Sequence, residues 1–327
     1  MIISKTPLRI SFVGGGTDLP DFHEDHGVKG RVISATIDKY IYVTANRKFD
    51  NKIRVSYSKT ELVDNVEQVE HNIIREALKL VGIVKSVEIV CTSDLPIAGG
   101  GSGLGSSSAL AVGVLKALYA LNGEHVPAER LANEAYNIER KVLGLPVGKQ
   151  DHYAAAFGGL NLITFDVDGA VAVDPVICAA GVYASVSEKL LMFYTGISRA
   201  SSSILVDQAK NTNLHVNRYI DLANAALDFH DALVKGDLEH CYQIMREGWS
   251  VKKKLATNIS NQQIDTWYDA AINAGALAGK IAGAGGGGFL FFLGEKDVHS
   301  DIKGVLSDLF HLKCKITRRG SHIIHVS

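Results

Sequence analysis

The spacing of apolar residues divides this chain into strands and helices. Alternating or β-branched stretches predict strands, and apolar positions three or four residues apart predict helices. The expected strands are residues 9–13, 31–45, 52–57, 86–92, 160–165, a strand starting at 189, 289–293, 313–316 and 323–326. The expected helices are residues 72–81, one starting within 103–109, one opened by Pro127, a helical block over 200–273, and residues 298–310.

This mixture of strands and helices, without an internal repeat, indicates an α+β protein. The chain has 327 residues, of which 46% are hydrophobic, so it is long enough for two domains of ordinary size. A new apolar strand begins at residue 189, and we place the boundary just before it. The expected domains are residues 1–180 and 181–327.

Charge and cysteine content exclude several classes of function. The 34 Lys and Arg residues balance 35 Asp and Glu residues, and no basic stripe indicates a nucleic-acid partner. No apolar run approaches the length of a membrane span, and the first residues do not resemble a signal peptide. The four cysteines form no C-x-x-C pair. We therefore expect a cytoplasmic protein whose partners are small molecules or a second copy of itself.

A first glycine segment, Gly14-Gly15-Gly16-Thr17-Asp18, follows the strand over residues 9–13. Loops at strand ends often carry binding sites, and Thr17 and Asp18 add a hydroxyl and a carboxylate. Asp18 would also serve as a simple helix cap for the segment after Pro20. His23 and His26 suggest a metal site, but a solvated polar helix face explains them better.

A second, longer glycine segment covers residues 95–109 and opens a helix. Glycines let the backbone approach a ligand, and the first turn of a helix has N–H groups without intrahelical partners. Together they form a cradle for phosphate. On a helical wheel Ser107 lies with Ala111, Val114 and Leu118, so we expect its hydroxyl to point inward, toward a magnesium ion or a phosphate oxygen. A flexible turn before a capped helix is the simpler alternative, and the segment matches neither the P-loop nor the Rossmann pattern.

Candidate acidic groups follow this segment. In the helix after Pro127 the apolar stripe is Leu131, Ala135, Ile138 and Val142. Glu139 lies on one margin of this stripe and Glu134 on the other, so Glu139 is either a partly desolvated ligand or a surface residue. Further on, Lys149 and Asp151 stand two apart in a short segment bounded by glycines. Asp151 is a plausible proton acceptor for a substrate hydroxyl, and a structural ion pair is the alternative. The neighbouring His152 suggests a hydrolytic triad, but no G-x-S-x-G elbow is present.

A third glycine cluster, residues 279–288, precedes the apolar strand 289–293. Taken together, Pro7–Asp18, Gly103-Leu-Gly-Ser-Ser-Ser-Ala109 and Ile281–Gly288 resemble the three motifs of the GHMP kinases, which phosphorylate small hydroxyl compounds. The resemblance spans nearly the whole chain in the correct order. It implies an N-terminal domain like ribosomal protein S5 domain 2, a ferredoxin-like C-terminal domain, and use of ATP and Mg²⁺.

The resemblance also implies roles for individual residues. Ser107 and Glu139 match the magnesium ligands, Asp151 matches the carboxylate that takes the proton, and Arg9 and Lys149 are the available cations. The residues implied to bind ATP are Gly101, Ser102, Gly103, Leu104, Gly105, Ser106, Ser107 and Ser108. Those implied to bind the substrate are Gly14, Gly15, Gly16, Thr17, Asp18, Gly283, Ala284, Gly285 and Gly286.

Within the family, the first motif and the Gly-Lys-Gln-Asp segment are most similar to kinases of D-glycero-D-manno-heptose 7-phosphate, which act at the anomeric oxygen. This implies a role in nucleotide-sugar synthesis for a bacterial surface glycan. Galactokinases have a Glu where this chain has Gly15, and losing that negative charge favours a phosphorylated sugar. Arg199, Lys149 and Arg31 are candidates for holding the phosphate. The segment from Pro96 is about three residues longer than in the family. The alternatives are a kinase of a free sugar such as fucose or galactose, and a non-catalytic sensor.

Overall fold

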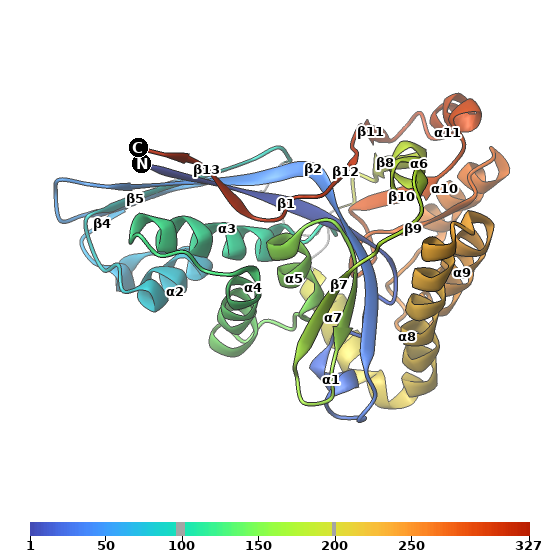
Figure 1. The fold of residues 1–327 in the computed structure, drawn as a ribbon, viewed down its shortest axis with the longest axis horizontal. Helices are drawn as coiled ribbons and strands as arrows, with labels where there is room; N and C mark the ends of the chain where they lie inside the picture. The colour runs from blue at the N-terminus through green and yellow to red at the C-terminus, as the bar shows by residue number, and fades with distance from the viewer. Residues whose placement is uncertain (96–101, 198–200) are drawn as a thin grey trace.

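The computed structural model describes residues 1–95, 102–197 and 201–327, without the side chains of residues 201 and 202. The strands within these ranges form two sheets, and helices pack against both (Figure 1). The larger sheet contains β1 (Ile2–Val13), β2 (Gly30–Arg47), β3 (Ile53–Ser56), β4 (Thr60–Val63), β5 (Val87–Ser93), β6 (Leu160–Phe165), β7 (Val171–Pro175), β12 (Ile316–Thr317) and β13 (His322–Val326).

The long strand β2 organises this sheet. The main strand order is β13-β1-β2-β5-β3-β4, and β2 also pairs with β6 and β12 along other parts of its length. Helices lie along one face of this sheet (Figure 1). They are α2 (Asn72–Val81), α3 (Ser106–Leu121), α4 (Ala128–Tyr136) and α5 (Gln150–Phe157), while the short helix α1 (Pro20–His23) follows the first glycine segment.

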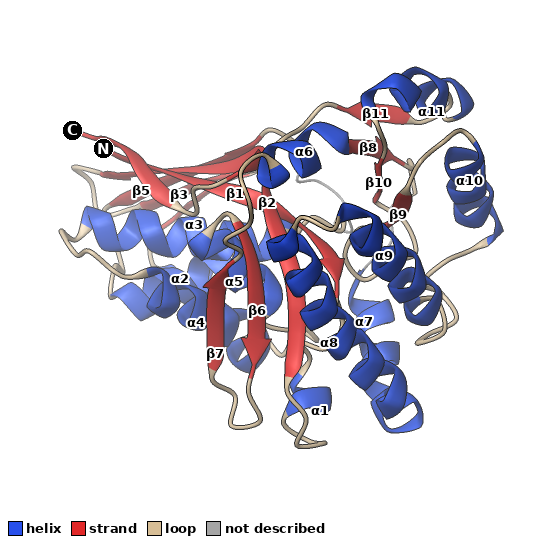
Figure 2. Ribbon diagram, turned by 45° about the vertical axis from the view of Figure 1, so that its right-hand side comes forward, coloured by secondary structure: helices blue, strands red, loops and turns tan. Residues whose placement is uncertain are grey.

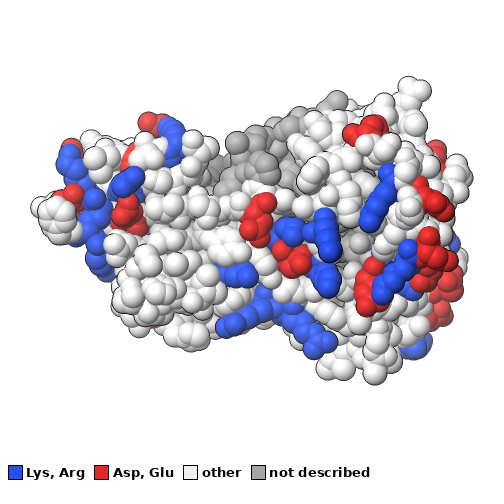
Figure 3. Space-filling view, turned by 90° about the horizontal axis from the view of Figure 1, so that it is seen from above, with Lys and Arg blue, Asp and Glu red and all other residues white. Residues whose placement is uncertain are grey.

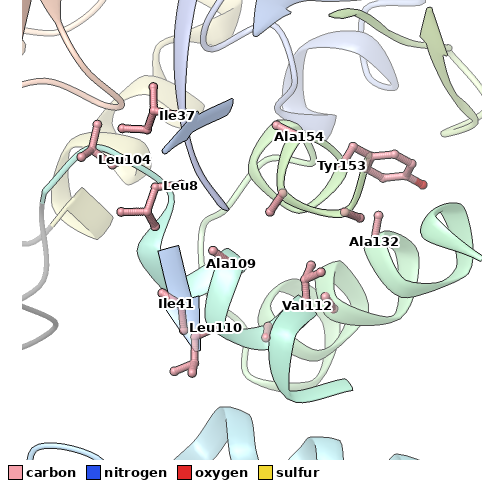
Figure 4. Packing of buried hydrophobic residues seen from close by; sticks show 14 of the residues in the cluster. Leu8, Ile37, Ile41, Leu104, Ala109, Leu110, Val112, Ala132, Tyr153 and Ala154 are labelled. Atoms are coloured by element: carbon pink, nitrogen blue, oxygen red, sulfur yellow. The ribbon is translucent and has the colours of Figure 1, made fainter. Parts of the chain in front are cut away.

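The core beneath the sheet holds α3 in place. Almost every residue from Ser108 to Leu118 is buried, because α3 packs against the sheet on one side and other helices on the other. Leu8 and Ile41 from the strands surround Ala109 and Leu110 at the start of α3 (Figure 4). The N-terminal turn of this helix is therefore held in a fixed place, which matters for the site described below.

The smaller sheet is antiparallel, with the strand order β11-β8-β10-β9. Its strands are β8 (Leu190–Tyr194), β9 (Ala278–Ile281), β10 (Phe289–Leu293) and β11 (Phe310–Leu312). The accompanying helices are α6 (Val182–Lys189), α7 (Ser201–Lys210), α8 (Thr212–Lys235), α9 (Leu238–Lys252), α10 (Gln262–Asn273) and α11 (His299–Val305). Helices α8 and α9 lie side by side between the two sheets (Figure 2).

The end of the chain returns to the first sheet. Strand β13 pairs with β1, and β12 pairs with β2, so the last strands of the expected second domain belong to the larger sheet. A boundary near residue 180 still falls where the larger sheet gives way to the smaller one. Strand pairing between residues some 320 positions apart, such as Ile2 with Val326, leaves no local pattern in the sequence.

Most expected elements are present, and the main discrepancy lies near the C-terminus. The helix α2 has the predicted bounds. The helix expected over 298–310 ends at Val305, and residues 310–312 form β11 instead. Pairing with β8 decides the conformation there. Within the described ranges no helix is both long and apolar enough to cross a lipid bilayer. Acidic and basic side chains are interspersed over much of the face seen in Figure 3.

Candidate active site

The second and third glycine segments are in direct backbone contact. A Cβ atom on Gly103 would lie 2.3 Å from the carbonyl oxygen of Ala282, and one on Gly283 would lie 2.6 Å from the Cα of Gly103. Both residues also have positive φ angles, 75° and 69°. Only glycine meets both conditions. The contact closes one side of a cavity of about 940 Å³, which the first segment also lines through Gly16 and Asp18.

The N-terminus of α3 faces this cavity as a phosphate cradle. Gly105 caps the helix in a left-handed conformation, and none of the described side chains accepts a hydrogen bond from the first-turn amides. Leu104 is fully buried and anchors the segment in the core (Figure 4), while its carbonyl accepts the N–H of Arg9 at 3.1 Å. The amides therefore keep their hydrogen-bonding capacity for an anion. Gly101 and the insertion from Pro96 lie outside the described residues.

The serine predicted to point inward does not. Ser107 is exposed at the cavity, whereas Ser108 is buried and donates a hydrogen bond to Glu139 Oε2 at 2.8 Å. The helical wheel was misleading because α3 is buried almost all round beyond its first turn, so no single stripe marks the interior. Ser102, Ser106, Ser107 and Ser108 all line the cavity, together with Gly103 and Gly105.

Glu139 is buried inside the protein rather than on a margin. It lies in a π-helical turn, Asn137–Val142, whose wider spacing rotates Glu139 inward and turns Val142 outward to 59% exposure. Its Oε2 also lies 2.5 Å from His152 Nε2. Burial alone would raise the pKa of Glu139, but His152 and the hydroxyls of Ser108 and Ser107 outweigh it and lower that pKa. Glu139 is thus a buried anion.

The second carboxyl oxygen of Glu139 lies next to the cavity lining formed by Ser107 and Ser108 but is not itself among the lining groups. Oε1 is buried and has no hydrogen-bond partner among the described groups. An orphaned carboxylate oxygen beside a serine hydroxyl suits Mg²⁺, which prefers oxygen ligands and retains water and phosphate in its shell. No group of three or more His, Cys, Asp or Glu side chains is placed to hold a metal in the described chain. The residues therefore fit a magnesium ion that depends on phosphate for its other ligands.

Asp151 lies against the phosphate cradle. It sits in the first turn of α5, and its Oδ1 accepts a hydrogen bond from Arg9 Nε at 2.7 Å and forms an ion pair with Arg9 Nη2 at 2.6 Å. Arg9 Nη1 also donates to the carbonyl of Gly103, so the guanidinium joins the carboxylate to the cradle. A Cβ on Gly105 would lie 3.3 Å from Asp151 Oδ2. The side chain of Asp151 is 24% exposed, so a substrate can reach it.

The other predicted cation, Lys149, points away from Asp151. Its ammonium donates to the carbonyl of Gly169 at 2.6 Å and to Glu24 at 3.2 Å, and it does not line the cavity. Residues two apart at a helix start project in nearly opposite directions, since each adds about 100° of rotation. We therefore withdraw the predicted catalytic role of Lys149. Arg31 does not line the cavity either, and Arg199 lies outside the described residues.

The first glycine segment divides into structural and cavity-facing residues. The hydroxyl of Thr17 is fully buried and bonds to the backbone of Gly14 and Arg31. Asp18 does not cap α1, whose N-cap is Leu19. It accepts hydrogen bonds from the Gly16 N–H and the Gln150 side chain, and burial together with the charge of Asp151 raises its pKa.

The predicted substrate residues therefore fall into two groups. Those that line the cavity are Gly16, Asp18, Gly283 and Ala284. Those that do not line it are Gly14, Gly15, Thr17, Gly285 and Gly286. The two histidines of the rejected metal site form no metal cluster, and His23 Nδ1 lies 2.9 Å from the carbonyl of Asp166.

Two buried lysines near the site were missed by sequence reasoning. Lys252 lines the cavity and donates to the Gly283 carbonyl at 2.7 Å, and burial lowers its pKa to about 8. Lys280 is also buried, which lowers its pKa, is close enough for the charge of Lys252 to lower that pKa further, and donates to the Ser11 carbonyl at 3.1 Å. A signal for Lys252 existed, because it continues the buried stripe of α9 formed by Cys241, Met245 and Trp249. The run of three lysines at 252–254 concealed it.

This arrangement defines a class of protein: a phosphate cradle beside an arginine-paired carboxylate in a two-sheet α+β fold. Two family models match the chain, GHMP kinases N terminal domain over residues 69–159 and GHMP kinases C terminal over residues 229–310. The chain belongs to the GHMP kinase family, and the expected family and fold class are confirmed. It is a phosphotransferase of a family that uses ATP as phosphate donor.

Within this family the chain is similar to several sugar kinases. The chain is 32% identical over 310 residues to the D-glycero-alpha-D-manno-heptose 7-phosphate kinase of Campylobacter jejuni, covering 89% of this chain and 88% of that protein. It is 27% identical to a galactokinase of Pyrococcus furiosus, with 90% of each covered. A crystal structure of a D-glycero-D-manno-heptose 1-phosphate kinase from Bacteroides thetaiotaomicron has a TM-score of 0.82 and 27% identity, covering 100% of both chains.

Proposed function

We propose that the protein transfers the γ-phosphate of ATP to the anomeric 1-hydroxyl of D-glycero-D-manno-heptose 7-phosphate. The observation that carries this proposal is the Asp151–Arg9 pair, which contacts the phosphate cradle inside one cavity of about 940 Å³. The similarity to a heptose 7-phosphate kinase over most of both chains supports the choice of sugar. The product would serve the synthesis of a nucleotide-activated heptose.

Asp151 is the proposed proton acceptor. Arg9 occupies its Oδ1, whereas no described group donates to Oδ2, which can accept the proton of the sugar hydroxyl. The hydroxyl oxygen then forms the new bond to the γ-phosphorus, the bond from that phosphorus to the β–γ bridging oxygen breaks, and ADP leaves. The α3 amides and the Arg9 guanidinium stabilise the negative charge on the transferred group.

Ser107 and Glu139 are the proposed magnesium ligands. When bound, Mg²⁺ supplies positive charge to the phosphate oxygens of ATP. The contribution of the chain is positional, since His152 and Ser108 hold the Glu139 carboxylate by one oxygen. The other oxygen is left for the metal. A partner that orients a ligand in this way commonly affects metal affinity by about 10–100-fold.

A panel of acceptors tests the proposed function. The purified protein is incubated with ATP, MgCl₂ and one acceptor: the heptose 7-phosphate, the same heptose without phosphate, a hexose 6-phosphate, galactose or fucose. ADP release gives the rate, and ³¹P NMR identifies the phosphorylated oxygen. We expect kcat/KM for the heptose 7-phosphate to exceed that of the free heptose by about 100-fold, the value of one or two charged hydrogen bonds to phosphate. Turnover confined to free sugars would contradict the proposal.

A further inference from the structure

Lys252 brings an ammonium group to an unusual place in the cavity. It ends α9, is 3% exposed, and contacts the third glycine segment through the Gly283 carbonyl. It also contacts the first segment, because a Cβ on Gly15 would lie 3.1 Å from Lys252 Nζ. The ammonium therefore lies in the space beside Gly15 that a side chain at that position would enter.

The three glycines of the first segment are glycines for different reasons. Gly14 and Gly16 have φ angles of 88° and 106°, which disfavour any other residue. Gly15 does not have a positive φ, so its backbone would accept a side chain. The feature that a side chain at Gly15 would disturb is the space around Lys252. A glycine at position 15 thus leaves the Lys252 ammonium in its place, which a larger residue would crowd.

The ammonium has no carboxylate of its own. Within the described residues, no Asp or Glu forms an ion pair with Lys252, and its hydrogen bond is to a carbonyl. The charges that act on it are Asp18 and Asp151, which favour its protonation, and Arg9, which opposes it. Asp151 is already paired with Arg9. A buried cation without a partner is costly, so a bound anion would stabilise this corner of the cavity.

We propose that Lys252 binds the phosphate that the sugar substrate already carries, at the point where its side chain lines the cavity. This inference rests on the proposed function, since it assumes a phosphorylated sugar. The transferred phosphoryl group needs a cation next to Asp151, and Arg9 already contacts Asp151 and the cradle. Lys252 contacts Gly15 and Gly283 instead. A lysine ammonium is a compact positive charge with three hydrogen-bond donors, which suits it to binding phosphate.

The test compares Lys252→Met with Lys253→Met, a matched control whose ammonium is partly exposed and bonds to Asp265. KM and kcat are measured for the heptose 7-phosphate, the unphosphorylated heptose and ATP. We expect Lys252→Met to raise KM for the heptose 7-phosphate by about 100-fold, with kcat, KM for ATP and the rates with free heptose within about threefold of wild type. Lys252→Arg should recover part of the loss, and the control should behave as wild type.

A second variant tests the same proposal if Lys252→Met does not fold. Gly15→Glu places a carboxylate next to the ammonium, which cancels its charge and repels phosphate. We expect it to lose activity with the heptose 7-phosphate while retaining activity with the free heptose. An equal loss with both sugars, or a fall in kcat alone, would overturn the proposal and assign Lys252 to the transferred phosphoryl group. Failure of the wild type with any sugar phosphate would instead reject the proposed function.

Discussion

The two acidic centres of the site differ in accessibility and in the partner that each oxygen has. Asp151 is 24% exposed, and Arg9 occupies one of its oxygens. Glu139 is fully buried, and His152 and Ser108 occupy one of its oxygens. Asp151 and His152 are adjacent on α5, so the helix rotation sends the first to the cavity and the second to Glu139. One turn of helix thus supplies both the proposed proton acceptor and the group that positions the proposed metal ligand.

Among the changes considered, replacing Asp151 should lower activity the most. Asp151→Asn removes the proton acceptor but keeps the shape of the side chain, so we expect kcat to fall by about 1,000-fold. Binding of ATP, followed by the thermal shift, should change little. Asp168→Asn, an exposed carboxylate on a turn, is the control. Retention of wild-type kcat by Asp151→Asn would remove this residue from the mechanism.

Replacing His152 tests the buried centre. His152→Ala leaves the Glu139 carboxylate without its closest partner, and we expect the apparent affinity for Mg²⁺ in the presence of ATP to fall by about 10–100-fold. His152→Gln keeps a donor and should recover part of this affinity. The readout is activity as a function of free Mg²⁺. If His152 only supports folding, the variant will be less stable but its Mg²⁺ requirement will be unchanged.

Ser107 and Ser108 allow the loss of an exposed hydroxyl to be compared with the loss of a buried one. Ser108→Ala removes a buried hydrogen bond to Glu139, so we expect a loss of about 2 kcal/mol in the free energy of unfolding. Ser107→Ala changes an exposed side chain, so its stability should remain within about 0.5 kcal/mol of wild type while its activity falls. Urea denaturation measures the stabilities. Equal stability losses in the two variants would contradict the assigned orientations.

The smallest expected effect concerns pH and the buried cation. Because the pKa of Lys252 is lowered from 10.5 to about 8, the folded protein binds fewer protons than the unfolded chain between these values. Stability without ligand should therefore rise as pH increases through 8, by about 1 kcal/mol between pH 7 and 9. Lys252→Met removes this contribution. The difference in the free energy of unfolding between wild type and variant, measured by urea denaturation at each pH, should therefore increase from pH 7 to pH 9. A difference that does not vary with pH would show that Lys252 stays charged.

Local pattern was sufficient for much of the fold and for the placement of the glycine segments. The bounds of α2 and of the strand after the third segment follow from periodicity alone. The pairing of β13 with β1 could not be predicted, because it joins the two ends of the chain. The inward turn of Glu139 required a π-turn that a regular helical wheel does not contain. The side-chain orientations of Lys149 and Lys252 depend on the residues that pack around them in the fold. The charges along the sequence do not reveal these neighbours.

The return of the chain to its first strand has a consequence for biosynthesis. Strand β1 carries Arg9 and leads into the first glycine segment, and its outer neighbour is β13. A nascent chain that has reached residue 310 already contains all three glycine segments, yet the edge of β1 is still bare. Unpaired strand edges attract other chains. The larger sheet is therefore complete only once residues 322–326 have been made, and a chain that stops before them would expose an aggregation-prone strand edge.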